Sequence, residues 1–291
     1  MNSARNLLPV AALIASILSL TLGTSFAKHL FPLIGAQGTT SFRVTFAAVI
    51  LLAIWRPWRL PLSAREARTI ALYGAALGLM NLTFYMALRT IPLGIAIAIE
   101  ITGPLCVAMA ASRRPRDFVW IGLAVLGLLL LLPLHQSANR LDPLGVGYAL
   151  ASAVCWALYI VFGQRAGKAH GGQATSLGLT VAALVVLPFG LAHAGAALFN
   201  PSLMLAGLGV GIMSSALPYS LEMIALRRLP KKTFGVLLSL EPAVGAVIGF
   251  IVLGETLTPR QWLAIGSVIV ASIGSTLGAR KAEGARVESR P

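Results

Sequence analysis

Long apolar runs, each of roughly 18 residues or more, recur along the whole sequence. A run of this length crosses about 30 Å of hydrocarbon as an α-helix, in which every backbone polar group is satisfied within the segment. The connectors are short and leave no room for a water-soluble domain. The runs fall at about 7–27, 37–55, 69–88, 93–112, 117–134, 143–163, 174–193, 202–223, 234–253 and 261–279. The sequence therefore predicts an all-α integral membrane protein of about ten transmembrane helices.

Composition excludes the soluble classes of protein. Hydrophobic residues make up 57% of the 291 residues and charged residues 11%, which is too apolar for a water-exposed globule. The formal charge of +14 comes from basic residues that lie between apolar runs and not on a water-facing polar surface. We therefore predict that the chain contacts membrane lipids and does not bind nucleic acid. Cys106 and Cys155 lie inside apolar runs without metal-ligand spacing, which predicts no disulfide, metal or cofactor.

The first run also fits a signal peptide, because Ser25 and Ala27 lie at cleavage-like positions near its end. We interpret it as an uncleaved first helix, since the orientation of the later helices requires it. Most of the 23 lysines and arginines fall in alternate connectors, and the positive-inside rule makes that side cytoplasmic. The exceptions are Arg43 within a run and, on the opposite side, Lys28, Arg89, Arg140 and Arg260. Both termini are therefore predicted to be cytoplasmic.

The two halves of the chain resemble each other. Ala-Leu-Arg-Thr-Ile-Pro at 87–92 matches Ala-Leu-Arg-Arg-Leu-Pro at 225–230, and a glycine precedes a glutamate by six positions at Gly94 and again at Gly235. When a repeat has an odd number of spans, its second copy enters the membrane in the orientation opposite to the first. We therefore predict two inverted five-helix repeats. The predicted boundaries are 1–140 for the first repeat, 141–280 for the second, and 281–291 for a disordered cytoplasmic tail.

Ionisable residues within a span are candidates for a functional site, because inserting each one costs about 2.5–3.5 kcal/mol. Glu100 and Glu241 occupy matching places in the fourth and ninth runs, so inverted symmetry predicts that both lie near the membrane midplane. Pro104 frees the backbone carbonyl of Glu100, and Pro242 frees that of Leu238. The functional interpretation is that one or both glutamates bind a substrate ammonium group or take up a proton. The alternative is a structural glutamate bonded between helices.

Two other charged residues have less specific interpretations. The planar guanidinium of Arg43 suits a substrate carboxylate, and the competing interpretation is an ion pair with an intramembrane glutamate or a side chain that snorkels to the interface. Glu222 lies about one turn from Arg227 and Arg228, which favours an interfacial salt bridge over a substrate contact.

Several hydrogen-bonding side chains lie on otherwise apolar runs and are further candidate contacts for a substrate or between helices. They are Asn81, Tyr85, Trp156, Tyr159 and Tyr219. The sequence lacks zinc-protease, nucleophile-elbow and phosphate-loop motifs, so we predict that it is not an enzyme and does not use ATP.

Two motifs carry a family resemblance. With Leu-Glu-Pro at 240–242 and Leu-Gly-Glu-Thr-Leu-Thr-Pro at 253–259, the sequence resembles the drug/metabolite transporter superfamily, EamA type. Longer strings at 31–33, 91–96, 102–105, 112–115 and 216–226 resemble bacterial inner-membrane exporters of threonine and homoserine. The similarity runs from about residue 20 to about residue 277.

The resemblance implies a secondary active exporter of small amino acids in the bacterial inner membrane, coupled to protons by antiport and working by alternating access. Its expected partners are an amino acid, protons and lipids, and a homo-oligomer is compatible with the sequence. The alternatives are export of another polar metabolite or drug by the same fold, a non-transporting membrane sensor, or an intramembrane enzyme.

Overall fold

The computed structural model describes residues 3–59, 62–110, 117–131, 141–170, 172–218, 221–222, 225, 237–238 and 240–288. Its elements are α1 (Ser3–Lys28), α2 (Phe31–Trp55), η1 (Pro57–Arg59), α3 (Ala64–Ala87), α4 (Leu93–Glu100), α5 (Thr102–Ala110), α6 (Asp117–Leu131), α7 (Pro143–His170), α8 (Gly172–Ala194), η2 (Gly195–Phe199), α9 (Pro201–Gly211), η3 (Ile212–Ala216), α12 (Glu241–Leu253) and α13 (Pro259–Glu288). All elements in these ranges are helices, which confirms the all-α class.

Several of these helices are long and apolar enough to cross a membrane by length and composition. Within the described ranges they are Leu8–Lys28, Phe31–Trp55, Ala64–Ala87, Pro143–Gly163 and Gly172–Phe199. Shorter apolar helices occupy Leu93–Val107, Pro201–Ala216 and Glu241–Leu253. The helical geometry changes within or next to them: Ile101 forms a turn, η3 is a π-helix, and Leu240 forms a turn before α12 begins. The chain thus contains several membrane-spanning helices, while a total of about ten crossings stays a prediction.

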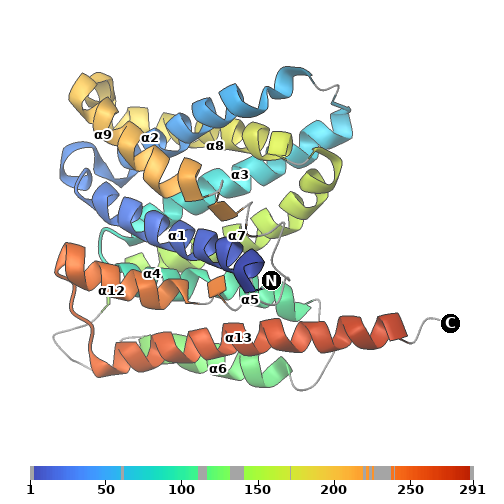
Figure 1. Cartoon of the computed structure of the whole chain (residues 1–291). Helices are drawn as coiled ribbons and strands as arrows, with labels where there is room; N and C mark the ends of the chain where they lie inside the picture. The colour runs from blue at the N-terminus through green and yellow to red at the C-terminus, as the bar shows by residue number, and fades with distance from the viewer. Residues whose placement is uncertain are drawn as a thin grey trace.

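The helices lie roughly parallel in one bundle, and the start of α1 and the end of α13 lie on the same side of it (Figure 1). α2 packs on α8, α3 packs on α7 and α8, α4 on α12, and α6 on α13. α1 packs against α12 and η3. Helices from the two ends of the chain therefore interleave in one bundle.

Close helix approach depends on small residues. A Cβ added to Gly74 would lie 2.4 Å from the carbonyl oxygen of Gly178, and one added to Gly94 would lie 2.5 Å from the Cβ of Ala246. Glycine at these positions lets α3 approach α8, and α4 approach α12, at backbone distance.

Polarity is distributed as lipid requires. Large apolar side chains such as Leu205, Leu263 and Phe250 are 61–71% exposed on the outer surface. Several buried hydroxyls bond back to their own helix, as Thr40 Oγ1 does to Ala36 O at 2.7 Å. The bundle therefore has an apolar exterior and a partly polar interior.

Asp142 begins the second half of the chain by capping α7. The backbone N–H groups of Leu144 and Gly145 donate to its carboxylate, each at 3.2 Å. A hydrogen bond from Thr90, together with these backbone bonds, holds the pKa of Asp142 below its usual value. The cap is therefore present at neutral pH and is lost only in acid, as the pH falls through that lowered pKa.

The last helix extends further than the sequence predicts. α13 continues to Glu288, across most of the range 281–291 predicted as a disordered tail. The residues at 279–283 are alanine, arginine, lysine and glutamate, all strong helix formers, which explains why the helix continues.

Candidate functional site

Glu100 lies at a break between two helices. It is the last residue of α4, Ile101 forms a turn, and α5 begins at Thr102. Pro104 has no N–H to donate to the carbonyl of Glu100, so the helical ladder is interrupted there. The hydroxyl of Thr102 donates to the carbonyl of Ile99 at 2.6 Å and satisfies one of the remaining groups.

Glu241 occupies a corresponding break on the facing helix. It is the first residue of α12, with Pro242 next to it, and the positive end of the helix dipole favours a carboxylate there. The side chains of Glu100 and Glu241 are 8% and 5% exposed. They lie within electrostatic range of each other and of Arg43, so the structure brings these three predicted site residues together.

Ser152 on α7 shares a single proton between two acceptors. Its hydroxyl lies within hydrogen-bond distance of Glu100 Oε1, and it also reaches the carbonyl oxygen of Met80 at 2.9 Å. A serine has one donor, so it can serve only one of these oxygens at a time. When Glu100 is protonated, Glu100 can donate to Ser152 while Ser152 donates to Met80.

Arg43 is held by groups that carry no charge. Its Nε donates to Ser215 Oγ at 2.9 Å, and its Nη2 donates to the carbonyl of Ser214 at 2.9 Å. Its Cζ lies 5.2 Å from the centroid of the Tyr85 ring. No carboxylate of the described chain forms an ion pair with Arg43. The predicted alternative of an ion pair with an intramembrane glutamate is therefore not found within those residues.

The two serines come from a π-helical segment. η3 spans Ile212–Ala216, where the hydrogen-bond register lengthens, and such segments are frequent at functional sites. Sequence reasoning missed Ser214, Ser215 and Ser152. The available signal was a pair of adjacent serines inside an apolar run.

Glu222 lies beside α1, within electrostatic range of Glu241. The hydroxyl of Ser16 is 3.4 Å from Glu222 Oε1. Its predicted salt-bridge partners, Arg227 and Arg228, lie outside the described residues. Glu222 is therefore a further carboxylate near Glu241, in addition to Glu100.

The remaining candidates fall into three groups. Tyr85 adjoins the cluster through Arg43. Asn81 donates to the carbonyl of Leu77 in its own helix at 2.8 Å, and the Tyr159 ring on α7 stacks on the Tyr73 ring of α3 with 5.0 Å between centroids. Trp156 is partly buried on α7, and Tyr219 lies outside the described residues.

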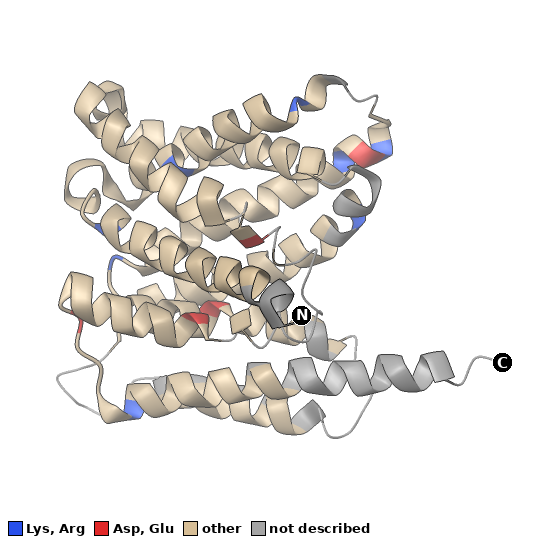
Figure 2. Cartoon of the chain, in the orientation of Figure 1, with Lys and Arg blue, Asp and Glu red and all other residues tan. Residues whose placement is uncertain are grey.

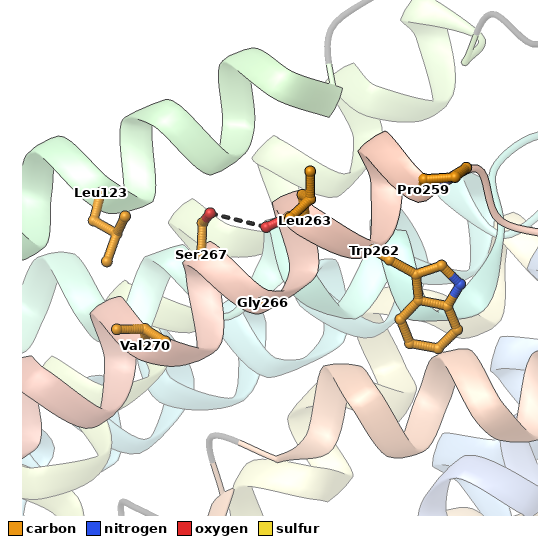
Figure 3. Close-up of a pocket in the computed structure, with 7 residues that line it drawn as sticks. All are labelled: Leu123, Pro259, Trp262, Leu263, Gly266, Ser267 and Val270. Atoms are coloured by element: carbon orange, nitrogen blue, oxygen red, sulfur yellow. Dashed lines mark hydrogen bonds between the residues drawn. The ribbon is translucent and has the colours of Figure 1, made fainter.

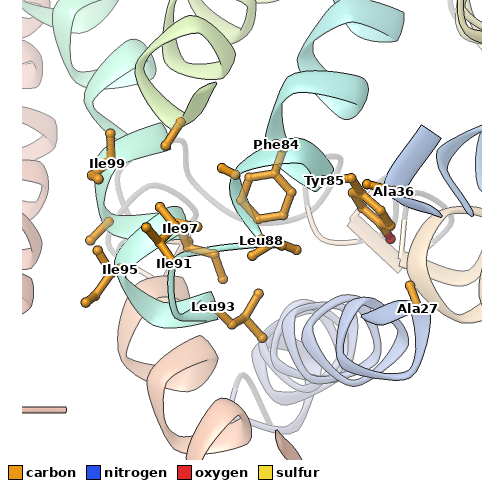
Figure 4. Close-up of a cluster of buried hydrophobic side chains, with 14 of the residues drawn as sticks. Ala27, Ala36, Phe84, Tyr85, Leu88, Ile91, Leu93, Ile95, Ile97 and Ile99 are labelled. Atoms are coloured by element: carbon orange, nitrogen blue, oxygen red, sulfur yellow. The ribbon is translucent and has the colours of Figure 1, made fainter. Parts of the chain in front are cut away.

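Apolar side chains of α3, of α4 and of the loop between them form a buried cluster that extends along α4 to Ile99, the residue before Glu100 (Figure 4). Phe84, Leu88, Ile91, Leu93 and Ile99 are all at most 7% exposed. Charged side chains are sparse along the described helices, and acidic positions occur inside the bundle as well as at its ends (Figure 2). Glu100, which is itself 8% exposed, therefore adjoins a buried apolar cluster.

An open groove lies elsewhere on the molecule. It is lined by Leu123 of α6 and by residues of α13, including Trp262 and Val270 (Figure 3). Its one hydroxyl, on Ser267, donates to the carbonyl of Leu263 at 2.8 Å and is not free for a ligand. The groove is an apolar part of the outer surface and contains none of the predicted site residues.

One ion pair closes the end of the bundle opposite the chain termini. Lys28, the last residue of α1, lies 2.6 Å from Glu255 Oε1, and the N–H of Leu93 donates to Glu255 Oε2 at 2.8 Å. Gly254 adopts φ +65°, a left-handed conformation that ends α12 and turns Glu255 toward α4. We call these contacts the Lys28–Glu255–Leu93 junction.

An apolar helical bundle that encloses carboxylates and an arginine defines a multi-pass membrane protein with an internal polar site. A sequence model of the EamA-like transporter family matches residues 143–277. The threonine/homoserine exporter RhtA of Escherichia coli (strain K12) is 52% identical over 274 residues, covering 94% of this chain and 93% of that protein. The RhtA of Salmonella typhimurium (strain LT2) is 50% identical over the same share of each chain.

A more distant relative is also described as an inner membrane transporter, and a solved structure has a similar fold. The uncharacterized inner membrane transporter YedA of Escherichia coli (strain K12) is 28% identical over 65% of this chain and 64% of its own. A protein crystal structure aligns with a TM-score of 0.60 at 20% identity, over 97% of this chain and 98% of that chain, which supports the fold alone. The chain belongs to the EamA-like transporter family, and it is a transporter and not an enzyme.

Proposed function

We propose that this chain exports threonine and homoserine from the cytoplasm across the inner membrane, as a secondary active transporter driven by proton antiport. The observation that carries the substrate class is the 50–52% identity, over 94% of the chain, to two bacterial threonine/homoserine exporters. The site chemistry agrees with it. A zwitterionic amino acid needs an anionic and a cationic partner, and Glu100, Glu241 and Arg43 supply both within one buried cluster.

Each residue then has a role. Arg43 binds the substrate carboxylate with the guanidinium N–H groups that Ser215 and Ser214 leave free. Glu100 and Glu241 receive either the substrate ammonium or a proton, so that binding one expels the other. When Glu100 gains or loses a proton, Ser152 changes its hydrogen-bond acceptor, because its single hydroxyl proton can be donated either to Glu100 or to the carbonyl of Met80.

Inverted repeats at 1–140 and 141–280, rocking against each other, provide alternating access. The packing supports this proposal. α2 packs on α8, α4 on α12 and α6 on α13, and in each pair the two helices hold the same rank in the two predicted repeats. The basic connectors and the common side of the two chain ends support cytoplasmic termini.

The test is efflux from proteoliposomes loaded with labelled threonine or homoserine, with the membrane potential clamped. Acidifying the outside should accelerate efflux from the wild type, because protons enter as substrate leaves. Glu241→Gln and Glu100→Gln should each abolish the acceleration. Glu66→Gln should keep it, because Glu66 lies in the capping box of α3, where the glutamine oxygen can still accept from the N–H of Ser63.

Two results would contradict the proposal. Absence of threonine and homoserine efflux from correctly inserted protein would reject the substrates and point to another polar metabolite or drug. Acceleration by acid that persists in both glutamine variants would remove these carboxyls from proton coupling.

A further inference from the structure

The hydroxyl of Tyr85 is buried without a hydrogen-bond partner. The side chain of Tyr85 is 0% exposed, and its Oη contacts no donor or acceptor among the residues that the structure describes. A buried polar group left unpaired costs free energy, so such a group usually serves a bound molecule or an ordered water.

The ring that carries this hydroxyl lies beside Arg43, the proposed carboxylate-binding residue. The Tyr85 ring lies 5.2 Å from Arg43 Cζ and 5.8 Å from the Phe31 ring. In Figure 4 the oxygen of Tyr85 points away from the leucine and isoleucine side chains and lies on the side of Ala27 and Ala36. The hydroxyl is thus directed away from the larger aliphatic side chains of the apolar cluster, and the ring that carries it contacts Arg43.

Three other buried side-chain atoms of the described residues lack a hydrogen-bond partner, and none of them belongs to a ring that lies over Arg43 as Tyr85 does. They are Gln37 Oε1, Thr45 Oγ1 and Ser176 Oγ. Tyr85 is thus the unpaired group that shares a contact with the proposed carboxylate-binding residue.

The two proposed substrates both carry a side-chain hydroxyl group, which the hydroxyl of Tyr85 can hydrogen-bond. Threonine carries its hydroxyl on Cβ and homoserine carries it on Cγ, and removing either hydroxyl gives the same compound, 2-aminobutyrate. A phenol both donates and accepts, and its proton rotates, so one tyrosine can bond a hydroxyl at either carbon.

We propose that Tyr85 binds the side-chain hydroxyl of the substrate and so selects hydroxylated four-carbon amino acids over 2-aminobutyrate, an inference that rests on the proposed function. A site that holds a substrate hydroxyl rejects the analogue without it, because its own polar group is then left unpaired. Arg43 binds the substrate carboxylate, and Tyr85 hydrogen-bonds the hydroxyl group of the substrate side chain.

The experiment measures inhibition of labelled threonine counterflow in proteoliposomes by unlabelled threonine, homoserine and 2-aminobutyrate. In the wild type, 2-aminobutyrate should inhibit about tenfold less strongly than threonine, the factor for one net hydrogen bond. In Tyr85→Phe, threonine and homoserine should weaken about tenfold while 2-aminobutyrate is unchanged, so the selectivity disappears. Tyr148→Phe removes a hydroxyl from a tyrosine packed on the apolar cluster and should keep the wild-type selectivity.

Transport by the wild type distinguishes a failure of the proposed function from a failure of this inference alone. A wild type that transports neither threonine nor homoserine rejects the proposed function and this inference with it. A wild type that transports both but does not distinguish them from 2-aminobutyrate overturns only the inference, and needs no variant. Selectivity retained in Tyr85→Phe, or an equal loss for all three amino acids, also overturns it, because the hydroxyl would then serve water or packing.

Discussion

At the scale of single residues, the interior depends on one arginine whose bonding capacity is only partly used. A guanidinium has five N–H donors. Two bonds, to Ser215 Oγ and Ser214 O, are made within the described chain. Burying a charge is unfavourable unless its donors are satisfied, so the remaining donors favour an anionic ligand.

Arg43→Lys tests this residue. Lysine keeps the charge but cannot bond Ser215, Ser214 and a carboxylate from one planar group, so we expect threonine affinity to fall at least about tenfold. Insertion should be preserved, because the charge is unchanged. Arg65→Lys, at an exposed position of α3, is the matched control. Equal threonine affinity in both variants, measured by counterflow, would show that Arg43 does not contact the substrate.

At the scale of helices, α4 and α12 hold the two carboxylates together through a backbone-to-backbone contact. Position 94 tolerates no side chain, because an added Cβ would lie 2.5 Å from Ala246 Cβ and 2.7 Å from Ala246 N. The separation of these helices therefore sets the relation of Glu100 to Glu241.

Gly94→Ala should push the two helices apart. We expect destabilisation of about 1–3 kcal/mol from overpacking, together with slower transport. Gly147→Ala is the matched control, because a Cβ there meets nothing within 4 Å, and it should be neutral or stabilising by roughly 0.5–1 kcal/mol. Thermal unfolding in detergent and threonine efflux measure the two effects. Equal stability of the two variants would contradict the close packing.

The helices could be predicted from the sequence because apolar length is a local property. The predicted run 143–163 begins at the first residue of α7, and Pro104 indicated the interruption that the structure has at Ile101. The run predicted at 37–55 begins late, because α2 starts at Phe31 and bends at Gly35, where φ is +68°. The site was only partly predictable. Charged residues in lipid are conspicuous, but the contact of Arg43 with Ser215, 172 residues away, has no local signal.

At the scale of the whole molecule, the Lys28–Glu255–Leu93 junction joins α1, α4 and the segment after α12. It lies at the end opposite the chain termini, since Lys28 ends the helix that begins there. If the halves rock, this junction must open whenever that end opens.

Glu255→Gln tests the junction, because the amide oxygen can still accept from Leu93 N while the ion pair is lost. We expect about fivefold faster labelling of a cysteine at the buried position Ala27 by an impermeant thiol reagent, as for loss of about 1 kcal/mol. Cys106 and Cys155 are replaced beforehand. Lys28→Met should act likewise, whereas Arg260→Gln, at an exposed arginine, should have no effect. An unchanged labelling rate in both junction variants would mean that the ion pair does not hold this end shut.

The way in which the buried hydroxyls are satisfied bears on how freely such a bundle can move. Thr21, Ser25, Thr39, Thr40 and Thr180 each bond a carbonyl one turn earlier in the same helix. A helix whose polar groups are satisfied internally can slide along its neighbour without stranding a donor in hydrocarbon. Sliding of these helices would therefore leave those internal bonds intact, and the hydrogen bonds that it must break are the ones between helices, such as those of Arg43 and Ser152.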